Sequence, residues 1–347
     1  MKSIVRARAP LRLGFAGGGT DVSPYCDLYG GAILNVTIGR YAQATITLHD
    51  EPRLCFAALD LGRSEELPLA AELPLDGGLV LHRAVYNVIT KDFNQGRPHG
   101  MSVVTHVESP MGSGLGSSSA LVVAIVEAMR EAFLLPLGEY DVAHLAFHIE
   151  REVAGLAGGR QDQYAATFGG VNYMEFHGDD RVIVNPLRVH RRIWNELESS
   201  LVLCFTGVSR ASAKIIEDQS QSVSGKMAGS LEAMHQLKED AVRMKNALLV
   251  GDIPGMAKVL RQSWEAKKRT SPAITNSHLD DIYDRAMARG AMAGKISGAG
   301  GGGFMFFLVD PVQRGEVMAT LREAGGEVSG CHMVTQGAEG WRVQHPA

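Results

Sequence analysis

This sequence of 347 residues has few cysteines, no long apolar segment and little net charge. Its four cysteines are widely spaced and form no C-x-x-C pair, which excludes a disulfide framework and a zinc ribbon. No apolar run approaches the roughly 18 residues of a membrane span, and the N-terminus lacks the apolar stretch of a signal peptide. We therefore expect a soluble, cytoplasmic protein with reduced thiols and no role at a membrane.

The chain also lacks a surplus of basic residues. Lysine and arginine number 34 against 38 acidic residues, and the formal net charge is −4. Proteins that bind nucleic acid usually carry a basic face, so this balance argues against a nucleic-acid partner. The length suggests two domains, and the sequence texture changes after about Pro186. We place the domains at residues 1–190 and 191–347.

Both halves contain expected strands and helices, so the predicted class is α+β. In the first half, strands are expected at 4–9, 32–38, 41–49, 54–58, 100–107 and 168–174, and helices at 79–93, 117–133 and 141–154. Residues 59–78 have little periodicity and are expected to form a surface excursion. In the second half, strands are expected at 201–205, 304–309, 331–334 and 341–343, and helices at 209–219, 231–249, 253–267, 278–289 and 312–324.

A glycine- and serine-rich segment, residues 109–120, precedes the most apolar predicted helix. Glycines let a ligand approach the main chain, and the unpaired amides of a helix N-terminus attract anions, most often phosphate. The alternative is a flexible loop capped by serine. The segment is not a Walker A motif, because no lysine follows its last glycine, and no acidic residue completes a dinucleotide fingerprint. The segment by itself indicates a phosphate site.

Two further glycine-rich segments lie next to predicted strands. The first, Gly17 to Asp21, reads G-G-G-T-D, and the other reads K-I-S-G-A-G-G-G-G-F from Lys295. Ligands commonly bind at the ends of sheet strands, where such loops lie. Asp21 either caps a turn or accepts hydrogen bonds from a polar ligand.

Taken together, the three segments resemble the motifs of the GHMP kinase superfamily, in the order and spacing of that family. P-M-G-S-G-L-G-S-S-S-A, from Pro110, is similar to the family's phosphate loop. The resemblance covers most of the chain and implies a two-domain fold. Its N-terminal mixed α/β domain contains a left-handed βαβ unit, and its C-terminal domain is ferredoxin-like. It also implies ATP and Mg²⁺ as cofactors.

The G-G-G-T-D form, together with Q-D-Q-Y from Gln161, is similar to D-glycero-D-manno-heptose 7-phosphate kinases and to the kinase domain of L-fucokinases. This likeness implies phosphorylation of an anomeric sugar hydroxyl, with the heptose 7-phosphate converted to the 1,7-bisphosphate. A kinase of an unphosphorylated sugar and a non-catalytic sugar or nucleotide sensor are the alternatives. A dinucleotide-dependent oxidoreductase is disfavoured by the missing acidic residue. The expected partners are a sugar or sugar phosphate and ATP, and the oligomeric state is not predicted.

The resemblance assigns binding roles to three groups of residues. Those expected at the nucleotide are Pro110, Gly112, Ser113, Gly114, Leu115, Gly116, Ser117, Ser118, Ser119, Gly298 and Gly300. Those expected at the sugar are Gly18, Gly19, Thr20, Asp21 and Gly170, with Arg210 and Lys214 at a phosphate on the sugar. Ser118 and Glu150 are the expected magnesium ligands, although the spacing leaves Glu152 as an alternative to Glu150.

Two residues are expected to act in phosphoryl transfer, which depends on positioning and charge neutralisation. Asp162 is the expected base that orients the attacking sugar hydroxyl, and its alternative role is that of a turn residue after Gly159. Arg12 follows the first strand, where the resemblance places a cation next to this aspartate. Because Arg12 is permanently charged, it would stabilise charge in the transition state.

Overall fold

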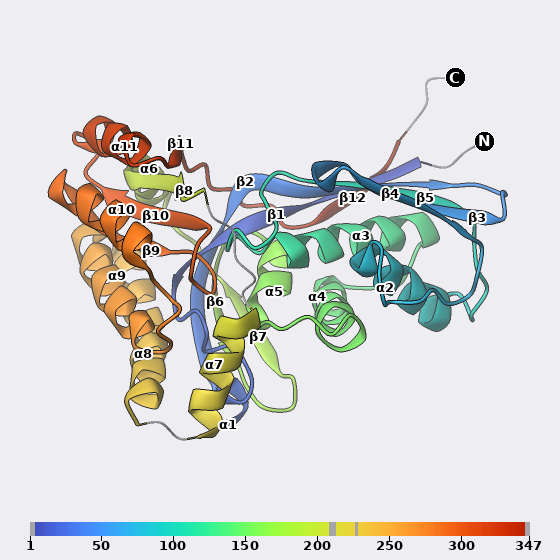
Figure 1. Ribbon diagram of the computed structural model, residues 1–347, viewed down its shortest axis with the longest axis horizontal. Coiled ribbons are helices and arrows are strands. Elements are labelled where there is room, and N and C mark those ends of the chain that lie inside the picture. The colour runs from blue at the N-terminus through green and yellow to red at the C-terminus, as the bar shows by residue number, and fades with distance from the viewer. Residues whose placement is uncertain (1–3, 208–212, 226–227, 344–347) are drawn as a thin grey trace.

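The computed structural model describes residues 4–207, 213–225 and 228–343, which form two sheets and their covering helices (Figure 1). The elements of the first part of the chain are β1 (Ile4–Ala16), α1 (Tyr25–Tyr29), β2 (Gly31–Leu48), β3 (Arg53–Ala58), η1 (Leu59–Leu61), β4 (Arg63–Pro68), α2 (Val80–Val88), η2 (Ile89–Phe93), β5 (Met101–Val107), α3 (Ser117–Phe133), α4 (Glu139–His148), η3 (Ile149–Val153), α5 (Gln161–Phe168), β6 (Val171–Phe176) and β7 (Val182–Pro186).

The second part of the chain continues with α6 (Arg191–Ser200), β8 (Leu201–Phe205), α7 (Ala213–Ser224), α8 (Ala228–Val250), α9 (Ile253–Lys268), α10 (Ser277–Ala288), β9 (Ala291–Ile296), β10 (Phe304–Val309), α11 (Arg314–Glu323), β11 (Glu327–Gly330) and β12 (Glu339–Arg342). The structure therefore confirms the predicted mixture of strands and helices. No helix in the described ranges is long and apolar enough to cross a membrane.

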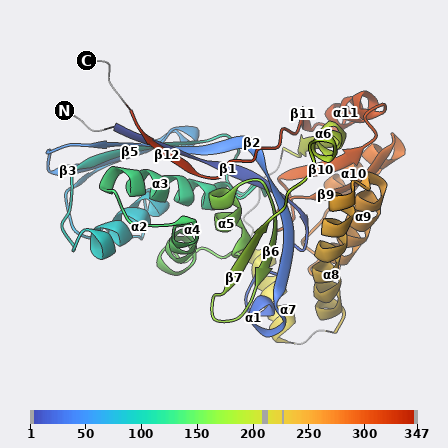
Figure 2. The same cartoon turned by 180° about the vertical axis from the view of Figure 1, so that it is seen from behind.

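The long strand β2 organises the first sheet. Two strands were expected between residues 32 and 49, but the segment forms one strand, Gly31–Leu48. Its first half pairs with β6, its second half pairs with β5, and both halves pair with β1. A register shift between Pro10 and Leu11 of β1 lies opposite the join of the two halves. One continuous strand thus links both parts of an eight-stranded sheet (Figure 2).

The helix α3 packs on β1 and β2 and is buried on nearly every side, as its apolar composition predicts. The segment from 59 to 78 differs from expectation, because it contains η1 and the edge strand β4. Strand β4 pairs with β3, and β3 in turn runs parallel to β5. The chain passes between these two parallel strands through β4 and α2, which forms a βαβ connection.

The second sheet has the order β11-β8-β10-β9, and all its neighbouring strands are antiparallel. Numbered along the chain, this order is 4-1-3-2, which is the ferredoxin-like arrangement. The division at residues 190 and 191 stays a prediction. Strand β12 lies beyond that division, yet it pairs with β1 of the first sheet, so the last described strand lies beside the first (Figure 1).

Candidate active site

The central glycine-rich loop forms one wall of a cavity, and its glycines are required by close contacts. At Gly114, a Cβ atom would overlap the carbonyl group of Ser297, and φ is +82°. At Gly116, φ is +78°, and a Cβ atom would lie 3.3 Å from the Asp162 carboxylate. Only glycine combines this backbone conformation with such proximity. The loop is therefore held between the third glycine segment and α5.

Helix α3 begins at this loop, and its first residues line the cavity. Its N-cap is Gly116, which has no side chain to satisfy these amides. Residues of the loop and first turn that line the cavity are Gly112, Gly114, Gly116, Ser117 and Ser118. Ser113, Leu115 and Ser119 lie buried beneath them, and Pro110 is exposed at the start of the loop. The open N-terminus of a long helix is suited to bind phosphate.

The buried carboxylate of Glu150 lies against the first turn of α3. Its Oε1 accepts a hydrogen bond from Ser118 Oγ at 2.6 Å. Its Oε2 accepts hydrogen bonds from Ser119 Oγ and from Gln163 Nε2, both also at 2.6 Å. Arg151 Nη1 lies 3.2 Å from Oε1 and neutralises the charge. Glu150 is therefore fixed in position from four sides, although it carries no exposed surface.

Glu152, the alternative to Glu150, points away from α3. Its side chain is 58% exposed and its Oε2 lies 2.7 Å from His148 Nδ1. The geometry therefore favours Glu150 as the carboxylate of a metal site. A hydroxyl oxygen next to a carboxylate oxygen suits Mg²⁺, which prefers oxygen ligands and usually completes its shell with phosphates and water. Within the described part of the chain, three or more acidic, histidine or cysteine side chains do not gather into a metal site of their own.

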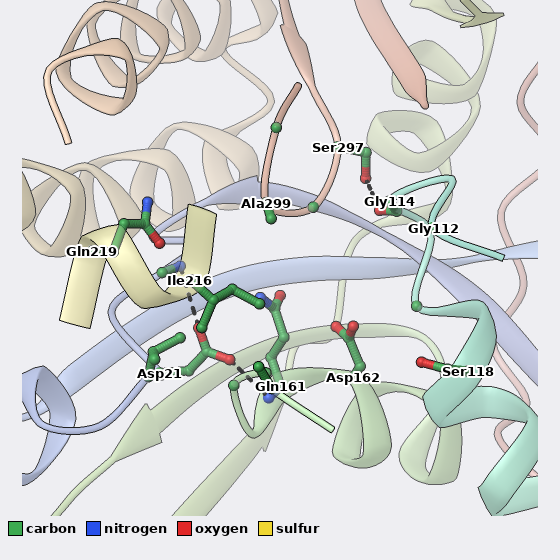
Figure 3. Close-up of a pocket in the computed structure, with 18 of the residues that line it drawn as sticks. Asp21, Gly112, Gly114, Ser118, Gln161, Asp162, Ile216, Gln219, Ser297 and Ala299 are labelled. Atoms are coloured by element: carbon green, nitrogen blue, oxygen red, sulfur yellow. Dashed lines mark hydrogen bonds between the residues drawn. The ribbon is translucent and has the colours of Figure 1, made fainter. Parts of the chain in front are cut away.

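Asp162, in the first turn of α5, is paired with Arg12 of β1. Arg12 Nε donates to Asp162 Oδ1 at 2.7 Å, and Nη2 lies 2.6 Å from the same oxygen. Arg12 Nη1 also donates to the Gly114 carbonyl oxygen, so the guanidinium joins Asp162 to the central loop. The Arg12 side chain is 4% exposed, whereas that of Asp162 is 19% exposed. Figure 3 shows Asp162 between Gln161 and Ser118, facing the cavity.

The first glycine segment forms the opposite wall through Asp21. Its Oδ1 accepts a hydrogen bond from the Gly19 amide at 3.2 Å, and its Oδ2 accepts one from the Gln161 amide at 3.0 Å. Burial raises the pKa of Asp21, and the nearby Asp162 acts in the same direction, whereas the amides lower it. A Cβ atom on Gly159 would overlap Asp21 Oδ2, so a glycine is required there too.

Other residues predicted at the sugar are placed differently. Thr20 is fully buried, and its hydroxyl bonds the carbonyl oxygens of Gly17 and Ala32, so it holds the loop to β2. Gly170 lies at the start of β6, where its amide donates to Thr37 Oγ1. Neither residue lines the cavity, and neither does Gly18, although Gly19 does. Lys214 is exposed and also does not line it. Arg210 lies outside the described residues.

The third glycine segment covers the cavity from the second sheet. Ser297 Oγ donates to the Gly114 carbonyl oxygen at 2.7 Å, which ties this segment to the central loop. Gly298 and Gly300 both line the cavity, as does Ala299 (Figure 3). All three glycine segments thus meet around one space, although they are far apart in the sequence.

Several residues that line the cavity are not predicted by the sequence analysis. Ile216 and Gln219 come from α7, Arg151 follows Glu150, and Lys267 comes from the last turn of α9. A signal for Lys267 is present in the sequence. It continues the helical spacing of the buried residues Leu260 and Trp264, so it is a lysine on the apolar face of an amphipathic helix. No comparable sequence signal marks Ile216 or Gln219.

Comparison with known proteins gives two family matches. The model described as GHMP kinases N terminal domain matches residues 80–170, and the model described as GHMP kinases C terminal matches residues 244–327. A curated relative, the D-glycero-alpha-D-manno-heptose 7-phosphate kinase of Campylobacter jejuni, is 46% identical over 99% of this chain and 100% of its own length.

A solved structure is similarly close. The crystal structure titled D-glycero-D-manno-heptose 1-phosphate kinase, from Bacteroides thetaiotaomicron, has a TM-score of 0.84 and 43% identity, and covers 98% of this chain and 100% of its own. The L-fucokinase/L-fucose-1-P guanylyltransferase of Bacteroides fragilis is more distant, at 25% identity over 92% of this chain and 36% of its own length.

Proposed function

Because this chain belongs to the GHMP kinases and is an ATP-dependent sugar kinase, we propose that it phosphorylates the anomeric hydroxyl of D-glycero-D-manno-heptose 7-phosphate to give the 1,7-bisphosphate. The single observation that carries this proposal is the Arg12–Asp162 pair. It lies between an open helix N-terminus, suited to ATP phosphates, and the wall formed by Asp21. The choice of heptose rests on the likeness to the Campylobacter jejuni kinase.

In the proposed reaction, the phosphates of ATP lie against the central loop and the first amides of α3. The oxygen at C1 of the sugar attacks the γ-phosphorus, and a new P–O bond forms. The bond between that phosphorus and the β–γ bridging oxygen breaks, and ADP leaves with the electron pair. Asp162 accepts the proton of the sugar hydroxyl, and positioning by this carboxylate counts as much as its basicity.

Arg12 and the serine–glutamate pair have supporting roles in this proposal. Arg12 keeps Asp162 oriented and places its permanent positive charge beside the transferred group. Ser118 Oγ and a Glu150 carboxylate oxygen would hold Mg²⁺, whose chemistry is to neutralise phosphate charge during transfer. Asp21 would accept hydrogen bonds from hydroxyls of the sugar, which fixes the orientation of C1.

The test is ATP turnover to ADP with magnesium and a panel of acceptors. The panel contains the heptose 7-phosphate, the corresponding free heptose, mannose, fucose, galactose and hexose 6-phosphates. Turnover on the heptose 7-phosphate, with the product phosphorylated at C1 by phosphorus NMR, supports the proposal. Turnover only on free sugars would instead indicate a sugar-1-kinase of the fucokinase kind, and ATP binding without turnover on any acceptor would indicate a sensor.

A further inference from the structure

Lys267 is a buried cation that enters the cavity from α9. Its side chain is 2% exposed overall, and its ammonium Nζ donates to the Gly298 carbonyl oxygen at 2.7 Å. A Cβ atom on Gly18 would lie 3.8 Å from Nζ. The ammonium therefore lies between the first and the third glycine segments. An ammonium has three N–H donors, and this hydrogen bond uses one of them.

Among the described residues, three cations line the cavity, and two of them have carboxylate partners. Arg12 is bound by Asp162, and Arg151 is bound by Glu150. Lys267 has no carboxylate oxygen within 4.0 Å anywhere in the described ranges. Asp21 is near enough to interact with it through space, but neither of its oxygens lies within 4.0 Å of Nζ, and the two are held by the amides of Gly19 and Gln161.

The surroundings of Lys267 make its unpaired charge unfavourable in free energy. Burial lowers its pKa to about 8, and the positive charge of Arg12 acts in the same direction. A second buried lysine, Lys295 of β9, lies close enough to interact with it, and its own pKa is lowered well below the ordinary value, mainly by burial. A buried charge of this kind is usually paired or neutralised. An anion bound in the cavity would supply the missing negative charge.

We propose that Lys267 binds the phosphate that the acceptor sugar already carries, and thereby selects a sugar phosphate over a free sugar. This inference rests on the proposed function, because it names the residue at that site which recognises the acceptor phosphate. The phosphates of ATP already have the α3 N-terminus and Arg12. Lys267 lines the cavity together with Gly19, Asp21 and Gln219, and its charge interacts with that of Asp21, the residue proposed at the sugar. It replaces the predicted Lys214 in this role.

The experiment compares Lys267→Met with a matched control, Lys268→Met, in the full chain. Lys268 is the next residue of the same helix, and its partner is the exposed Glu265. Equilibrium binding of the heptose 7-phosphate and of ATP is measured separately by calorimetry, so the result does not depend on turnover. Lys267→Met should weaken acceptor binding by about 10- to 100-fold, the range for a hydrogen bond to a charged group. Its ATP affinity should stay within about threefold of wild type, and Lys268→Met should match wild type for both ligands.

Two further readouts separate recognition from a structural effect. Lys267→Arg keeps the charge and should recover part of the acceptor affinity. The free heptose lacks the phosphate, so any binding or turnover of it should be nearly the same in Lys267→Met and wild type. Unchanged affinity of Lys267→Met for the heptose 7-phosphate would overturn the inference. So would a loss of ATP affinity in its place, or an equal loss for both acceptors.

Wild-type turnover tests the proposed function, whereas the effect of Lys267→Met tests the role of Lys267. Wild-type turnover on the heptose 7-phosphate with an unaffected Lys267→Met variant would refute the role of Lys267 and leave the proposed function standing. A wild type that uses another sugar phosphate, together with a variant that loses affinity for it, would refute the choice of heptose and leave Lys267 in its role. A wild type that acts only on free sugars would refute both statements.

Discussion

The two ends of the cavity are built differently. At the end with the central loop, the Glu150 carboxylate takes hydrogen bonds from Ser118, Ser119 and Gln163 and is paired with Arg151. At the opposite end, Lys267 lacks an ion-pair partner among the described residues, and the buried Gln161 Oε1 accepts no hydrogen bond there. The charged groups are paired at the first end, whereas the ammonium at the other end has no carboxylate partner in the described part of the chain; a buried amide oxygen without a hydrogen bond occurs at both, on Gln163 and on Gln161.

This contrast fits the tasks that we propose for the two ends. A nucleotide is recognised mainly through its phosphates, which main-chain amides of a pre-formed loop can bind. A particular sugar must be distinguished from others with the same number of hydroxyls. Buried polar groups that lack a partner until the correct ligand arrives give strong discrimination, because the wrong ligand leaves them unpaired. At the proposed acceptor end, Lys267 has that property.

The largest effect is expected where the two ends meet, at Asp162. Asp162→Asn keeps the size of the side chain and removes the proton acceptor, so kcat should fall by about 10²- to 10⁴-fold. Both ends should still bind their ligands, with the affinity for ATP and for the acceptor within about threefold of wild type. Rapid-quench measurement of the transfer step and calorimetry of each ligand check this. A kcat within tenfold of wild type would show that Asp162 is not the acting carboxylate.

The sequence predicts the two ends of the cavity to different extents. The central loop and α3 are predicted from local features, namely glycine spacing and an apolar helix, and the fold class from the mixture of strand and helix patterns and the family resemblance; the structure confirms these elements. The binding roles assigned to their residues stay predictions. At the acceptor end, Ile216, Gln219 and Lys267 are brought to Asp21 by the packing of the second half of the chain on the first. Spacing along the sequence does not carry that information.

Lys214 and Lys267 differ in what the sequence indicates about them. Lys214 lies near the start of a predicted helix, and its side chain is exposed and does not line the cavity, so its role at a sugar phosphate stays a prediction. Lys267 lies on the apolar face of α9, and its burial follows from that position. A charge on an apolar face therefore indicates a buried side chain, which a charge at a helix end does not. The strand β2 departs from prediction in another way, because the two strands expected at 32–38 and 41–49 form one strand, with a register shift in β1 opposite their join.

The second largest effect is expected at the central-loop end, with Glu150→Gln. The variant keeps one acceptor oxygen and removes the negative charge, so we expect the magnesium concentration for half-maximal activity to rise about 10- to 100-fold. Acceptor affinity measured without nucleotide should not change. The control is Glu152→Gln, since Glu152 is exposed and pairs with the exposed His148, and it should behave as wild type. If Glu152→Gln has the larger effect, the assignment of the metal ligand is wrong.

A smaller effect, confined to the acceptor end, is expected from Gly159→Ala. The added methyl group would overlap Asp21 Oδ2 and displace the carboxylate from the Gln161 amide. We expect the KM for the acceptor to rise about tenfold, as for the loss of one hydrogen bond to a charged group, with the KM for ATP unchanged. Gly315→Ala in α11 has open space around the new methyl group and serves as the control. A larger rise in the KM for ATP would mean that the two ends are not separable.

The smallest effect is expected on the free energy of unfolding, and it tests whether the unpaired charge of Lys267 destabilises the protein without ligand. The pKa of Lys267 is lowered by burial from 10.5 to about 8, which corresponds to about 3 kcal/mol of destabilisation at pH 7. Lys267→Met removes this term and also the hydrogen bond to Gly298, which offsets about 2 kcal/mol. The variant should therefore be more stable by about 1 kcal/mol in urea unfolding at pH 7.

The pH dependence of unfolding separates this effect from a general change in packing. Between pH 8 and pH 10.5 the folded protein releases the Lys267 proton while the unfolded chain retains it. The unfolded state then binds more protons, so the stability of the wild type should rise with pH across this window. Lys267→Met lacks that term, and its advantage should shrink and then reverse as the pH rises, since the lost hydrogen bond remains. A difference that stays constant from pH 7 to pH 10 would show that Lys267 is not held as an unpaired charge, and the contrast between the two ends would lose its energetic basis.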